Sequence, residues 1–126
     1  MSYQAVSHCG NDHQQWIKSI DFYKDDIKTL QTRLAEVATR NSAKEVLARL
    51  EHFQNQFIVQ RNNIDELKHR IHEHDGKVAK DVLQHVGKIE SAQVSEHDRI
   101  KAEVEGFEKV VNDLRKEFNE FLVKWM

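Results

Sequence analysis

The stretch HDRIKAEVEGFEKVVNDLRKEFNEFLVKWM, residues 97–126, decides the fold. Large side chains recur in it at steps of three and four residues, a spacing that places them on one face of an α-helix. Most of the residues between them are polar or charged and suit a face turned to water. The stretch therefore predicts an amphipathic helix with one continuous seam, made of His97, Ile100, Val104, Phe107, Val111, Leu114, Phe118, Phe121 and Trp125.

The same spacing of three and four residues continues upstream, where two short polar stretches interrupt it. Asn41 tolerates the left-handed conformation that often ends a helix. Ser42, followed three residues later by Glu45, matches the capping box that opens a new one. Asp75–Gly76 marks a second reversal, because glycine relieves the steric strain at the end of a helix. The chain therefore divides into three helical segments.

We predict an all-α fold in a single domain, a long antiparallel three-helix bundle with coiled-coil-like heptad seams. The polar stretch at 91–95 leaves an alternative, in which the third helix kinks or breaks there and the chain closes as a four-helix bundle. The predicted ranges are a flexible arm over residues 1–11 and helices over residues 12–40, 42–75 and 77–126.

Composition narrows the class of protein. The chain has 126 residues, no proline, and 19 basic against 21 acidic side chains. The absence of proline argues against a turn-rich β fold, and the evenly mixed charges leave no basic stripe for nucleic acid or an anionic membrane. We find no apolar run of transmembrane length, no secretory leader, and one cysteine, Cys9. We therefore expect a cytoplasmic protein that binds neither nucleic acid nor membrane.

The predicted third helix is longer than its neighbours. It draws level with Ser42 near Val110, which leaves about 16 residues, or roughly 24 Å, beyond the other two helices. Apolar side chains left in water there would mark a contact surface. We therefore predict a homo-oligomer, or binding to a helical protein partner, through Phe107, Val111, Leu114, Phe118, Phe121, Leu122 and Trp125.

Histidines supply a different hypothesis. The chain has eight, and antiparallel reversal brings most of them to one end of the bundle. Glu66 and His69 have the i, i+3 spacing of metal ligands in carboxylate bundles, although no second Glu-x-x-His follows on another helix. Imidazole and carboxylate together suit a transition metal. The candidate ligands are His13, Glu66, His69, Glu73 and His85.

Polar residues also occupy the seams, namely His13, Gln60, His74, Gln93 and His97. Such residues fix the register of a bundle or line a polar cavity. The chain has no glycine-rich phosphate loop, no Gly-x-Ser-x-Gly and no Cys-x-x-Cys. We therefore expect a non-catalytic scaffold or interaction module without a cofactor. The alternative is a metal-binding or redox bundle that uses the end rich in His and Glu.

Overall fold

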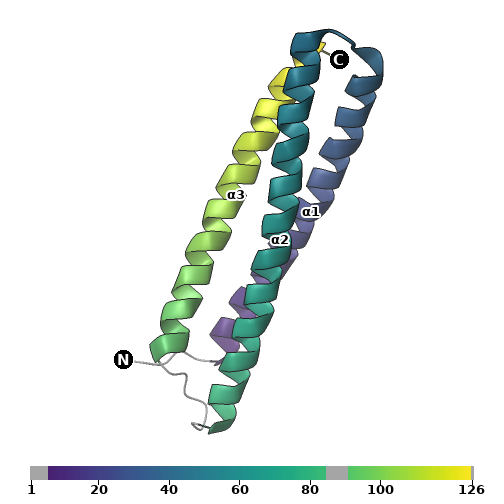
Figure 1. Cartoon of the computed structure of the whole chain (residues 1–126). Coiled ribbons are helices and arrows are strands. Elements are labelled where there is room, and N and C mark those ends of the chain that lie inside the picture. Colours follow the sequence, from purple (N-terminus) through teal and green to yellow (C-terminus); the bar gives the residue numbers. More distant parts are fainter. Residues whose placement is uncertain (1–5, 85–90, 126) are drawn as a thin grey trace.

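Three helices, each antiparallel to the next, make up the part of the chain that the structure describes (Figure 1). The computed structural model describes the backbone of residues 6–84 and 91–125, and the side chains of residues 12–80 and 93–125. The helices are α1 (Val6–Arg40), α2 (Lys44–Gln84) and α3 (Ser91–Trp125). These ranges contain no strand, so the predicted all-α three-helix bundle is confirmed. None of the three helices is both long and apolar enough to cross a membrane.

The apolar seams face one another and form a single core. Side chains three and four residues apart share one face of each helix, so each helix buries one stripe. Phe53, Phe57, Phe118 and Phe121 make an aromatic cluster toward the end where α1 and α2 are joined, with contacting ring centroids 5.1–6.3 Å apart. Other fully buried members of the core are Ile20, Ile27, Val37, Val46, Ile64, Ile100 and Val111.

The first reversal lies where the sequence predicts it. The Asn41 side-chain amide donates to the Val37 carbonyl at 3.0 Å, which satisfies one of the acceptors left open at the end of α1. The next helix begins at Lys44 rather than at residue 42, and the Leu47 amide donates to the Ala43 carbonyl at 3.0 Å. At its other end α1 begins at Val6 rather than at residue 12, so part of the predicted arm is helical.

The second reversal, predicted at Asp75–Gly76, is wrong, because α2 continues to Gln84. A single glycine inside a helix costs only about 1 kcal/mol. The seam continues past it, since His74 is buried and so is Val78, one turn further on. Burial of this turn therefore outweighs the penalty at Gly76.

The third helix is correspondingly shorter than the predicted range of residues 77–126. Residues 77–84 belong to α2, residues 85–90 lie outside the described part of the chain, and α3 begins at Ser91. The predicted kink at 91–95 is absent, since α3 is one helix from Ser91 to Trp125. In the described residues the alternative four-helix bundle does not form.

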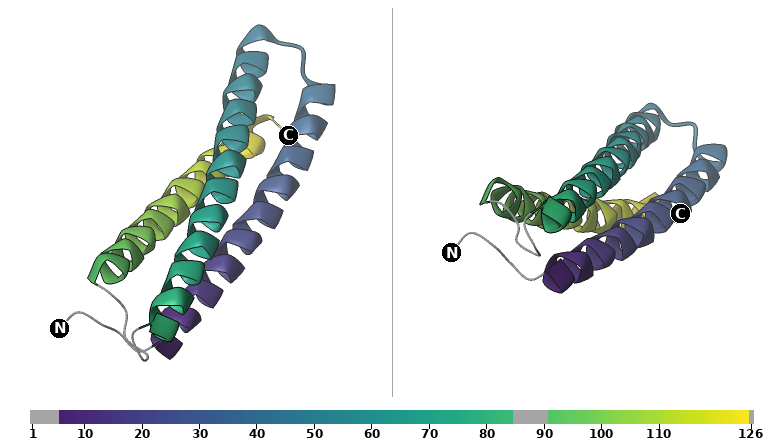
Figure 2. Two further views of the ribbon diagram at one scale, coloured as in Figure 1. Left: turned by 60° about the horizontal axis from the view of Figure 1, so that its bottom comes forward. Right: turned by 90° about the horizontal axis from the view of Figure 1, so that it is seen from below.

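The predicted overhang of the last helix is also wrong. In Figures 1 and 2 the C-terminal end of α3 does not pass beyond the loop that joins α1 and α2. Because α2 is longer and α3 shorter than predicted, the expected interface residues pack within the chain. Trp125 is partly buried, and the buried ones are Phe107, Val111, Leu114, Phe118, Phe121 and Leu122.

Candidate metal centre

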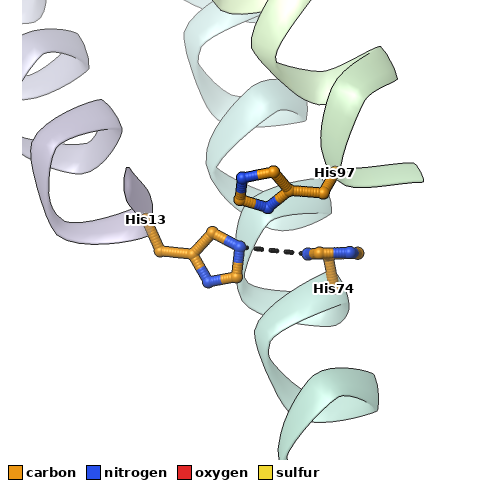
Figure 3. A group of neighbouring side chains, drawn as sticks. All are labelled: His13, His74 and His97. Atoms are coloured by element: carbon orange, nitrogen blue, oxygen red, sulfur yellow. Dashed lines mark hydrogen bonds between the residues drawn. The ribbon is translucent and has the colours of Figure 1, made fainter. Parts of the chain in front are cut away.

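Three buried histidines meet at the opposite end of the bundle, where α1 and α3 begin. His13 comes from α1, His74 from α2 and His97 from α3, with exposed fractions of 5%, 2% and 2%. One ring nitrogen of each lies within 4.8 Å of the other two (Figure 3). Among the described residues this is the only group of three or more His, Cys, Asp or Glu side chains arranged closely enough to hold a metal ion.

The second nitrogen of each ring contacts an oxygen outside the cluster. His13 Nδ1 lies 2.8 Å from Asp75 Oδ1, and His97 Nε2 lies 2.8 Å from Asp12 Oδ2. His74 Nε2 lies 2.9 Å from the Gln93 backbone carbonyl. Carboxylate and carbonyl oxygens only accept hydrogen bonds, so each of these ring nitrogens carries the proton and donates it.

These three bonds fix the tautomer of every ring. In the neutral imidazoles a lone pair remains on His13 Nε2, on His74 Nδ1 and on His97 Nδ1. His74 Nδ1 and His13 Nε2 are hydrogen-bonded at 3.0 Å, so a proton joins these two inner nitrogens, and a metal ion would take its place. His97 Nδ1 is buried and has no hydrogen-bond partner among the described residues. The cluster therefore turns three ring nitrogens toward one another, and one of them, His97 Nδ1, is unpaired.

The surroundings of His74 favour its neutral form. Burial lowers the pKa of His74, the hydrogen bond to the Gln93 carbonyl opposes this, and repulsion from His13 and His97 lowers the pKa further. Trp16 packs against two of the rings, with ring centroids 4.8 Å from His97 and 5.4 Å from His13. Neutral imidazole is the form that binds metal ions.

The lowered pKa of His74 predicts loss of stability in acid. An unfolded histidine titrates near 6.5, so below about pH 6.5 the unfolded chain binds a proton that folded His74 resists, and the free energy of unfolding falls with pH. The groups facing His74 are His13, His97 and Glu96. We expect urea unfolding with a chelator present to show this slope as the pH falls below about 6.5.

Two variants test whether the pH dependence of stability comes from buried His74 rather than from an exposed histidine. His74→Leu should flatten the slope, because it removes the buried group that resists protonation. His69→Gln should leave the slope unchanged, because the His69 side chain is 79% exposed. Equal slopes in both variants would contradict the assignment to His74.

The distances suit a tetrahedral ion of the size of Zn²⁺. Two metal–nitrogen bonds of about 2.0 Å at a tetrahedral angle separate their nitrogens by roughly 3.3 Å. The pair formed by His13 and His74, at 3.0 Å, is close to this value. Bringing His97 to the same separation requires a shift of at most about 1.5 Å, which rotation of its side chain can supply.

Most of the ligands predicted from the sequence lie elsewhere. Of the four that lie in the described residues, His13 alone joins the cluster. Glu66 and His69 are exposed on α2, and His69 Nε2 contacts Glu73 Oε2 at 3.5 Å along the same helix. His85 lies outside the described residues.

Sequence reasoning missed His74 and His97 as ligands, although heptad phase places both in the seams with His13. These seam positions did not point to a common site, because the second reversal was predicted in the wrong place. A turn at Asp75–Gly76 would put His74 at the very end of its helix, far from His97. With the reversal between Gln84 and Ser91, the two histidines lie at comparable distances on either side of it and face one another.

Comparison of the chain with protein-family models, curated proteins and solved structures finds no significant match.

Proposed function

We propose that this protein is a metal-binding helical bundle that holds one divalent transition-metal ion. His13 Nε2, His74 Nδ1 and His97 Nδ1 are the ligands, one from each helix. This proposal is the alternative that the sequence raised, with His74 and His97 in place of the ligands expected on α2 and at His85.

One observation carries the proposal. Each ring donates its outer N–H to an oxygen and turns its lone pair toward the other two rings. Histidines that bind metals almost always have such an outer partner, a carboxylate or a backbone carbonyl, which fixes the tautomer and makes the ligating nitrogen more basic. A cluster that served only as a register device would pair every buried nitrogen, whereas His97 Nδ1 has no hydrogen-bond partner among the described residues.

The chemistry of the ligands favours zinc or another late first-row metal. Imidazole suits Zn, Cu, Fe and Ni, whereas Mg and Ca prefer oxygen ligands. Asp12 and Asp75 are not needed as ligands, because each accepts a ring N–H. Burial of the three rings limits competition from water for the ion.

Titration of the chelator-treated protein, purified without an affinity tag, tests the proposal. We expect calorimetry to show one Zn²⁺ per chain. His97→Phe should lower the affinity at least about tenfold, because it removes one of three ligands while keeping an aromatic ring beside Trp16.

His52→Phe is the matched control, because His52 is exposed and lies near the other end of α2. It should bind zinc as the unaltered protein does. Equal affinity in His97→Phe and His52→Phe, or no saturable binding by the unaltered chain, would contradict the proposal.

The scaffold function remains a prediction, and the residues expected to form its contact surface are not exposed. Six of its seven expected anchor residues are buried between the helices of one chain, and Trp125 is partly buried. Binding of a partner through them would require the bundle to open. The metal-binding proposal needs no such rearrangement of the helices.

A further inference from the structure

Two unpaired polar atoms lie in the same part of the fold. Among the side chains that the structure describes, only Gln93 Oε1 and His97 Nδ1 are buried without a hydrogen-bond partner. Both are acceptors, and an acceptor is satisfied by a proton donor or by a cation. Buried polar atoms are nearly always paired, so two unpaired acceptors in one place call for a common explanation.

Gln93 is held next to the three histidines by its own backbone. Its carbonyl oxygen accepts from His74 Nε2 at 2.9 Å. Gln93 also precedes His97 by four residues on α3, so the two side chains share one face of that helix. The Gln93 side chain therefore lies one turn before His97 on the seam face of α3, and its amide oxygen is buried there.

We infer that Gln93 supplies the fourth ligand through Oε1, which makes the centre a closed site of three nitrogens and one oxygen. This inference rests on the proposed metal-binding function. Sites with four protein ligands are structural, whereas catalytic zinc sites keep one position for water or substrate. A closed site assigns the ion the role of joining the three helices at this end of the bundle.

Substitution of Gln93 separates the role of its side-chain oxygen from the role of its backbone carbonyl. Gln93→Ala removes Oε1 but keeps the carbonyl that accepts from His74, so the tautomer of His74 is preserved. Gln60→Ala is the matched control, because Gln60 is another buried seam glutamine, hydrogen-bonded to Asn63 at 3.2 Å. Gln93→Glu keeps an oxygen donor at the same position.

Co²⁺ is the probe, because its visible absorption reports the coordination number and the exchange of ligands. We expect azide to leave the spectrum of the full-length Co²⁺ protein unchanged. The spectra of the Co²⁺ forms of Gln60→Ala and Gln93→Glu should also stay unchanged. In Gln93→Ala, azide should shift the spectrum, and the affinity for Zn²⁺ should fall at least about tenfold. Far-UV circular dichroism checks that each variant is folded.

The outcomes separate this inference from the function on which it rests. If the unaltered chain binds neither Co²⁺ nor Zn²⁺, the metal-binding function itself is overturned. If it binds both ions, but azide shifts its spectrum or Gln93→Ala matches Gln60→Ala, the histidine site stands and Gln93 is not a ligand. If Gln93→Ala does not fold, the azide test on the unaltered protein and on Gln93→Glu decides whether Gln93 is a ligand.

Discussion

Saturating Zn²⁺ is expected to raise the melting temperature of the chelator-treated protein by roughly 15 °C. An ion that binds only the folded chain, at a thousand times its dissociation constant, adds about 4 kcal/mol to the free energy of unfolding. In a domain of this size 1 kcal/mol corresponds to about 4 °C. The effect should be large because the three histidines come from three helices, so unfolding separates all of them. Thermal unfolding followed by circular dichroism measures it.

His97→Phe should abolish the zinc-dependent shift while leaving the metal-free protein within about 1.5 kcal/mol of the unaltered chain. The variant loses the hydrogen bond to Asp12, but it also removes the unpaired Nδ1, whose burial costs about 1–3 kcal/mol. The matched variant His69→Phe, at an exposed position on α2, should keep the full shift. Equal shifts in the two variants would contradict the assignment of His97 as a ligand.

The metal-free protein should therefore be weakest at the histidine end. Two buried acceptors, Gln93 Oε1 and His97 Nδ1, lack hydrogen-bond partners among the described residues there. At the other end, Phe53, Phe57, Phe118 and Phe121 pack their rings together without buried polar atoms. An arrangement that leaves acceptors unpaired in one part of an otherwise apolar core is typical of a site kept for a ligand rather than for stability.

Heptad spacing was enough to predict the fold and most of the core. Residues such as Ile20, Phe53 and Phe118 lie where the seams place them, because burial of one face decides how a helix packs. The second reversal was not predictable from local signals. A glycine at position 76 disfavours helix by only about 1 kcal/mol, and the burial of Val78 that outweighs this penalty depends on packing with the other helices.

The candidate site was harder to predict than the fold for the same reason. A shift of the reversal changes which residues of α2 and α3 face one another, so the misplaced turn separated His74 from His97. The i, i+3 spacing of Glu66 and His69 was visible in the sequence, yet both face water. Ring tautomers depend on partners such as Asp75 and the Gln93 carbonyl, and no spacing rule specifies these.

Phe118→Ala is expected to lower the free energy of unfolding by about 3–5 kcal/mol. Phe118 is fully buried and packs against Phe53 and Phe57, with ring centroids 5.1 and 5.2 Å away. Truncation leaves a cavity that rigid helices fill only in part, and the loss is a large share of the roughly 5–15 kcal/mol that stabilises a typical domain. Urea unfolding followed by circular dichroism measures the change.

Val123→Ala is the control on the same helix, because Val123 is 87% exposed. It should change stability by less than about 0.5 kcal/mol. The comparison also decides between two roles for Phe118, as part of the core of one chain or as an anchor between chains. A core residue lowers stability to the same extent at every protein concentration, because no association is involved. If Phe118→Ala instead kept its stability and sedimented with a smaller mass than the unaltered protein, the anchor role expected from the sequence would be correct.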